Sequence, residues 1–157
     1  MSTPEARRDA EPHLYTVAVE GAVFHRGRYL FVVRSRRDRV YPGVLTLPGG
    51  KVEIEAEGES VLERSVRREV SEEAGVEVED DVHYVESKTF RLDDGRHVLD
   101  AVFLCRYRAG VARPDARETE AVVWLSPEEL ARRPDAQDWL IRSVALAEVK
   151  RRALGWQ

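Results

Sequence analysis

The chain of 157 residues has one cysteine, Cys105, only three lysines and a net charge of −4 at pH 7. A single cysteine excludes an intramolecular disulfide and any zinc or redox site built on paired cysteines. No apolar run exceeds five residues, which is too short for a membrane span, and the first residues contain no apolar signal segment. The negative charge disfavours binding along a nucleic-acid backbone. We therefore expect a cytoplasmic protein that binds neither membrane nor nucleic acid.

The order of the expected elements indicates an α+β fold. Periodicity and turn signals predict strands over residues 14–24, 29–33, 44–47, 82–92, 97–107 and 121–125. They predict helices over residues 60–74, 127–131 and 135–154. No repeat or linker divides the chain, so we expect a disordered tail over residues 1–12 and a single domain over residues 13–157.

Three residues are predicted to cap the starts of these helices. Ser60 and Glu63 have the S-x-x-E spacing of a capping box, and Gly75 follows the last turn of the same helix. Ser126 precedes a proline at the first helical position of the short helix. Asp135 is the expected cap of the final helix.

Three glutamates lie close together on the helix over residues 60–74. Its apolar stripe consists of Leu62, Val66, Val70 and Ala74. On a wheel of 3.6 residues per turn, Glu69 and Glu73 fall within or beside this stripe, and Glu72 flanks them. Carboxylates held together near a core repel each other and lose hydration, a cost that a divalent cation offsets. The alternative is a surface acidic patch paired with arginines.

Three segments of the chain resemble a known signature. Residues 68–76 read R-E-V-S-E-E-A-G-V, residues 47–53 read L-P-G-G-K-V-E, and residues 58–60 read G-E-S. Together they resemble the Nudix box of the MutT-like Nudix hydrolases, and residues 118–130 resemble the segment that closes this domain. The resemblance implies the Nudix fold, a mixed β-sheet in an α/β/α sandwich.

The spacing within the box departs from the family pattern. Eight residues separate Gly50 from Glu59 where the family has five, and eight separate Glu59 from Arg68 where it has seven. The R-E-x-x-E-E half is not shifted. The insertion therefore changes the position of Glu59 relative to the rest of the box. The place that this glutamate has in the family pattern could be taken by Glu57 or Glu63 instead.

The resemblance implies hydrolysis of a nucleoside diphosphate linked to another group, with Mg²⁺ or Mn²⁺ as the cofactor. It implies that the metal ligands are Gly50, Glu69, Glu72 and Glu73. It implies that the catalytic residues are Glu69, Glu72, Arg68 and Glu118. We expect substrate contacts from Arg34, Gly49 and Lys51.

Two of these assignments leave alternatives open, and the general base is not assigned. Glu120 competes with Glu118 as the glutamate outside the box. The wheel directs Arg68 away from Glu69, which makes Glu59 or the preceding loop its expected partner.

The substrate is narrowed only by elimination. Position 91 is arginine, where ADP-ribose-cleaving relatives place a proline, and residues 91–93 lack the tyrosine of diadenosine-polyphosphate relatives. A (deoxy)nucleoside triphosphate or related small-molecule nucleotide remains. The alternative function is a non-catalytic Nudix-fold nucleotide sensor. Trp139 and Trp156 are expected to make core or dimer contacts, which leaves a homodimer open.

Overall fold

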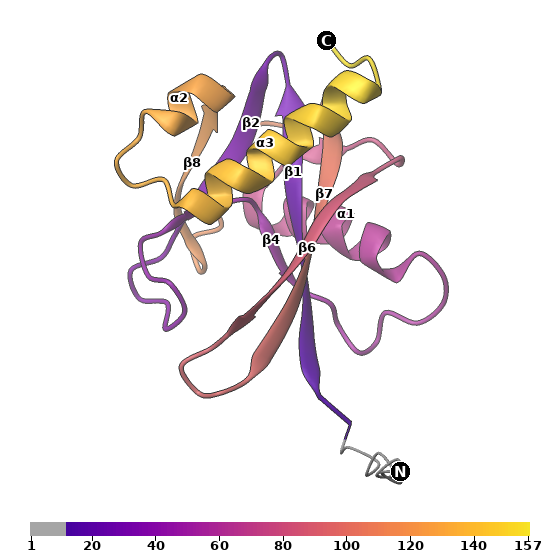
Figure 1. The fold of residues 1–157 in the computed structure, drawn as a ribbon, viewed down its shortest axis with the longest axis vertical. Helices are drawn as coiled ribbons and strands as arrows, with labels where there is room; N and C mark the ends of the chain where they lie inside the picture. The colour runs from indigo at the N-terminus through magenta and orange to yellow at the C-terminus, as the bar shows by residue number, and fades with distance from the viewer. Residues whose placement is uncertain (1–11) are drawn as a thin grey trace, which may run out of the picture.

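A computed structural model describes residues 12–157 (Figure 1). The tail expected over residues 1–12 therefore lies almost wholly outside the described residues. The strands are β1 (Tyr15–His25), β2 (Arg28–Arg34), β3 (Leu45–Thr46), β4 (Gly49–Lys51), β5 (Glu77–Val78), β6 (His83–Arg91), β7 (His97–Ala109) and β8 (Thr119–Leu125). The helices are α1 (Val61–Ala74), α2 (Pro127–Ala131) and α3 (Asp138–Ala153).

The strands form a mixed sheet. Its main order is β3-β2-β1-β7-β5, while β8 pairs with β2, β4 with β1 and β6 with β7. Strands β1 and β7 are parallel from the Tyr15–His97 pair to the Phe24–Arg106 pair, and the other pairs are antiparallel. The expected α+β fold with a mixed sheet is confirmed.

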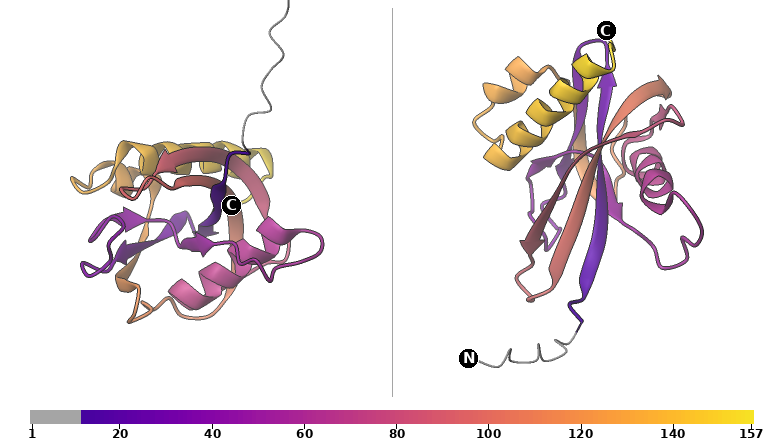
Figure 2. Two further views of the ribbon diagram at one scale, coloured as in Figure 1. Left: turned by 90° about the horizontal axis from the view of Figure 1, so that it is seen from below. Right: turned by 45° about the vertical axis from the view of Figure 1, so that its right-hand side comes forward.

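The sheet separates two apolar cores and gives the molecule three layers. Alternate residues of a strand point to opposite faces, so Val19 and Val23 of β1 face α1, whereas Ala22 and Phe24 face α3. Figure 2 shows α1 (magenta) on one side of the strands and α3 (yellow) on the other. Trp139 and Trp156 pack against the α3-side core, as expected. The α/β/α sandwich is thus confirmed.

Only one of the three predicted helix caps forms in full. Ser60 stands at the N-cap position of α1, but its backbone is left-handed (φ 53°) and its side chain makes no cap hydrogen bond, so the predicted capping box with Glu63 is wrong. The N-cap of α3 is Gln137, while Asp135 binds the Arg133 guanidinium instead. Ser126 forms a complete capping box with Glu129, as its spacing predicts.

The short strand β4, which the sequence did not predict, brings the glycine loop beneath α1. Gly49 pairs with Glu20 and Gly50 with Val19 across β1. A side chain at Gly49 would overlap the carbonyl of Val19, so the close approach of the two strands requires glycine. No helix within residues 12–157 is long and apolar enough to cross a membrane.

Candidate active site

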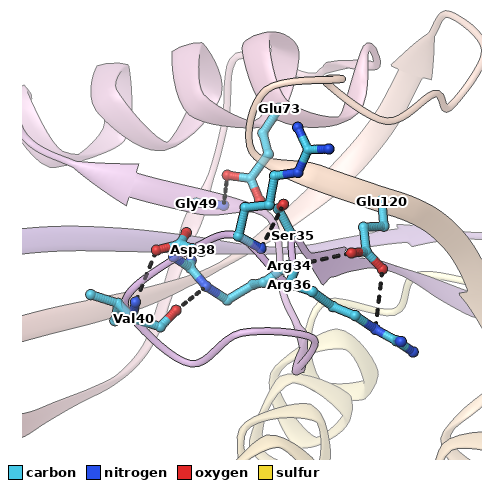
Figure 3. Close-up of polar contacts among 9 residues, drawn as sticks. Arg34, Ser35, Arg36, Asp38, Val40, Gly49, Glu73 and Glu120 are labelled. Atoms are coloured by element: carbon cyan, nitrogen blue, oxygen red, sulfur yellow. Dashed lines mark hydrogen bonds and ion pairs between the residues drawn. The ribbon is translucent and has the colours of Figure 1, made fainter.

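Glu73 is the most deeply buried residue of the box glutamates. Its exposed fraction is 5%, and its carboxylate accepts one long hydrogen bond, 3.4 Å, from the backbone N–H of Gly49 (Figure 3). Burial raises the pKa of Glu73 to about 8; the Gly49 N–H and Arg34 oppose this rise, while Glu118 and Glu69 add to it. Within residues 12–157, no basic side chain lies within ion-pair distance of Glu73. It is a buried acid without a direct counter-charge.

Glu69 lies one turn away and faces the second glycine of the loop. A Cβ added to Gly50 would lie 2.5 Å from Cδ of Glu69, so only glycine leaves room for this carboxylate. Burial raises the pKa of Glu69; Arg68 lowers it, and the charges of Glu72 and Glu118 raise it. Glu69, Glu73 and Glu118 therefore share one electrostatic environment.

Arg68 contacts the box itself, contrary to part of the prediction. Its guanidinium lies 3.0 Å from the carboxylates of both Glu69 and Glu72, the next residue and the residue one turn further along α1. The expectation that it faces away from Glu69 is therefore wrong. The loop alternative is confirmed, since Arg68 also lies 3.3 Å from the Glu53 carboxylate and donates to the Lys51 carbonyl.

The inserted loop, residues 53–59, is held by a different arginine. Arg64 donates hydrogen bonds to the backbone carbonyls of Glu57 (2.7 Å) and Glu59 (3.0 Å). The Glu59 side chain is exposed. The insertion thus bulges from the entry to α1, and Glu53 reaches Arg68 from the opposite end of the loop.

The two candidate glutamates outside the box point to different places. Glu120 binds the backbone N–H of Arg36 at 2.8 Å and lies 3.8 Å from its guanidinium, away from Glu73 (Figure 3). Glu118 is close enough to raise the pKa values of both Glu69 and Glu73. Its backbone carbonyl accepts a hydrogen bond from Ser35, which fixes it beside the end of β2.

The predicted substrate-binding residues are dispersed around the glutamates. Arg34 forms an ion pair with Asp38 and donates to the Val40 carbonyl, and its charge reaches Glu73 (Figure 3). Lys51 is exposed at the end of β4, and its charge helps to lower the pKa of Asp94, so it lies toward the β6–β7 turn. Gly49 presents its N–H to Glu73.

The donor set suits a hard divalent cation. It consists of carboxylates, and two of them have raised pKa values. Within residues 12–157, no three acidic, histidine or cysteine side chains already enclose a metal position. Glu69 and Glu72 instead share the Arg68 guanidinium. The chemistry of the carboxylates, rather than their present spacing, fits such a cation.

Two features near the site were not predicted. Glu53 is a partner of Arg68, and residues 113–117 form a segment tied to the last turn of α1. The signal for Glu53 was its place within L-P-G-G-K-V-E. For residues 113–117, the sequence offered two arginines shortly before Glu118.

Comparisons with known proteins agree with this arrangement. A family model described as the NUDIX domain matches residues 14–146. A MutT NUDIX hydrolase from Burkholderia pseudomallei superposes with a TM-score of 0.71 at 24% identity, covering 85% of this chain and 98% of that one. A MutT protein from Methanosarcina mazei Go1 gives 0.71 at 23% identity, covering 88% and 96%.

A third similar structure is the NUDIX domain of Shewanella oneidensis NrtR complexed with ADP ribose. Its TM-score is 0.67 at 20% identity, and the match covers 94% of each chain. No curated protein matches the sequence. The chain belongs to the NUDIX family. The predicted enzyme class, a hydrolase of pyrophosphate bonds, agrees with this membership.

Proposed function

We propose that this protein is a metal-dependent pyrophosphohydrolase that cleaves a nucleoside diphosphate linked to another group. We propose a (deoxy)nucleoside triphosphate or a related nucleotide as its substrate. The observation that carries the proposal is Glu73, a buried carboxylate that lacks an ion-pair partner among the described residues and lies near two further glutamates. A site that concentrates negative charge in this way is suited to Mg²⁺ or Mn²⁺.

Glu69 and Glu73 are the proposed principal metal ligands, together with the backbone carbonyl of Gly50. Glu72 joins them when Arg68 releases it. A bound divalent cation supplies Lewis acidity and neutralises charge on the phosphoryl oxygens. The burial of Glu73 supports this assignment, because an uncompensated carboxylate in the interior is otherwise costly.

The remaining residues orient the reactants. Arg68 keeps Glu69 in place by a charge-assisted hydrogen bond, and it holds Glu72 until a cation binds. Glu118 is the proposed additional acidic group, as a ligand or as the base that accepts a proton from the attacking water. Arg34 and Lys51 are proposed to contact phosphate oxygens, and Gly49 to orient Glu73 through its N–H.

The test is a phosphate-release screen with the purified protein. The panel contains nucleoside triphosphates, nucleoside diphosphates, nucleotide sugars, dinucleotides and ADP-ribose, each with Mg²⁺, with Mn²⁺ or with a chelator, and a coupled phosphatase. ADP-ribose is included because the NrtR domain was crystallised with it. Metal-dependent release from a triphosphate is the expected result.

A folded protein that binds nucleotides but releases no phosphate would contradict the proposal. That result would favour the non-catalytic sensor, which the sequence left open. Turnover that persists in chelator would contradict the metal assignment alone. The cytoplasmic location and the homodimer stay predictions.

A further inference from the structure

A groove of about 530 Å³ lies beside the C-terminal half of α1. One wall is formed by Ser71, Glu72 and Gly75, and the other by residues 113–117. Its volume falls in the range of small-molecule sites. Glu72 belongs both to this wall and to the box, so the groove adjoins the proposed metal site.

Backbone hydrogen bonds fix residues 113–117 to the same turn of α1 that carries the glutamates. The N–H of Arg113 donates to the Ala74 carbonyl at 2.9 Å, and the N–H of Asp115 donates to the Glu73 carbonyl at 3.2 Å. The Arg113 side chain crosses Gly75, where an added Cβ would lie 2.9 Å from its Cγ. The segment then leads directly into Glu118. The groove is therefore held at a fixed position relative to the glutamates of α1.

Arg113 and Arg117 bring two positive charges to this groove. The two carboxylates in its lining already have other partners: Glu72 binds the Arg68 guanidinium, and Asp115 accepts a hydrogen bond from the Arg117 backbone N–H. Among the described residues, neither has a carboxylate within ion-pair distance or a side-chain hydrogen bond. The arginines of α1 differ, since Arg64, Arg67 and Arg68 are all bound to carbonyls or carboxylates. A guanidinium with free donors is suited to bidentate binding of phosphate.

We propose that this groove is an anion subsite, in which Arg113 and Arg117 bind the phosphate groups at the far end of the substrate. The inference rests on the proposed function and narrows it. The subsite favours substrates whose group linked to the nucleoside diphosphate is itself a phosphate, and it gives no advantage to an uncharged sugar.

The test compares Arg113→Gln and Arg117→Gln with the wild type. Glutamine keeps the aliphatic stem that packs on Gly75 and removes the charge. The matched control is Arg132→Gln, an exposed arginine beyond α2 on the other face of the sheet. For a nucleoside triphosphate, each groove variant should raise KM about tenfold with kcat nearly unchanged, the size of one charge-assisted contact. KM for a nucleotide sugar should not change, and the control should affect neither substrate.

A binding measurement separates this inference from the proposed function. Inorganic tripolyphosphate is titrated calorimetrically into the metal-free wild type and into the Arg113→Gln/Arg117→Gln double variant. Loss of binding in the double variant supports the subsite even if the wild type hydrolyses no nucleotide. Equal binding to both proteins, or an equal rise in KM for both substrate types, overturns it.

Discussion

Carboxylates are buried on both faces of the sheet, and the two groups differ in how their charge is compensated. On the α3 face, Lys88 Nζ lies 3.1 Å from Glu20 and 3.7 Å from Asp100, and it also contacts Ser143. On the α1 face, Glu73 has only a long N–H contact and the more distant charge of Arg34, while Arg68 contacts Glu69 and Glu72.

The α3 face therefore holds a cation of its own beside its buried acids, and the α1 face holds none beside Glu73. The strand pairing that places Asp100 opposite Lys88 supplies the α3 face with its own cation. On the α1 face, Glu73 is similarly buried, but no lysine of the described residues lies beside it. A site left short of positive charge is where an external cation gains most, so function is expected on the α1 face.

The same change of carboxylate to amide should therefore have opposite consequences on the two faces. On the α1 face, Glu73→Gln should lower kcat roughly 10³-fold, because it removes a proposed ligand of the cation that stabilises the phosphoryl charge. The fold should persist, since the amide fills the same volume and avoids burying a charge. Steady-state kinetics and thermal unfolding of the same preparation measure both effects.

Glu128→Gln is the matched control for this variant. Glu128 is an exposed glutamate on α2, remote from the box. The activity of the Glu128→Gln variant should equal that of the wild type. If Glu73→Gln kept wild-type turnover, the active site would not depend on the buried carboxylate of the α1 face.

The two glutamates outside the box, Glu118 and Glu120, should show a smaller effect on kcat, which distinguishes between them. Glu118→Gln should lower kcat roughly 10²-fold, the usual contribution of one acid–base group. Glu120→Gln should leave kcat nearly unchanged, because that carboxylate is bound to Arg36. Reversed effects would transfer the role to Glu120, the alternative that the sequence left open.

Local patterns predicted most of the fold and the core of the candidate site. The wheel of α1 placed Glu69 and Glu73 on the buried side, because helical periodicity depends only on residues within the helix. The strands over residues 82–92 and 97–107 were predicted from the pattern within each segment, and the structure has β6 and β7 there. The unshifted R-E-x-x-E-E half carried the family assignment, which the family model over residues 14–146 confirms.

What the sequence did not predict depends on contacts between distant segments or on the insertion. Strand β4 exists because it pairs with β1, some thirty residues earlier. The left-handed backbone of Ser60, which leaves its side chain without a cap hydrogen bond, follows a loop whose length departs from the family pattern. The Lys88–Asp100 pair was accessible in principle, since counting outward from the Gly95 turn sets these residues opposite each other.

Metal binding should stabilise the fold only through the α1 face. A cation at 100 times its dissociation constant adds about 2.7 kcal/mol to the free energy of unfolding. For a chain of this size that corresponds to a rise in Tm of roughly 5–10 °C. Thermal unfolding with Mg²⁺ and with chelator should show the rise in the wild type and in Asp100→Asn, and its loss in Glu73→Gln. An equal rise in all three proteins would place the ion elsewhere.

On the α3 face, Asp100→Asn should stabilise the protein without a loss of turnover. Burial and the neighbouring Glu20 raise the pKa of Asp100 to about 9. Its carboxyl oxygens are buried without a hydrogen bond among the described residues. The folded chain therefore retains a proton that the unfolded chain releases above pH 3.8, and the free energy of unfolding falls as pH rises from about 4 to about 9.

Asparagine mimics the protonated carboxyl and removes this dependence. The variant should gain about 1–2 kcal/mol at pH 8 and almost nothing at pH 3.5, as measured by urea unfolding across this range. Asp93→Asn, at an exposed position of the β6–β7 turn, is the control and should follow the wild type at every pH. A destabilised Asp100→Asn at pH 8 would mean that the ionised carboxylate is held favourably by Lys88. The α3 face would then be stabilised by its ion pair, and the contrast with Glu73 would be sharper, because one face would hold an ionised acid beside its cation and the other a buried acid without one.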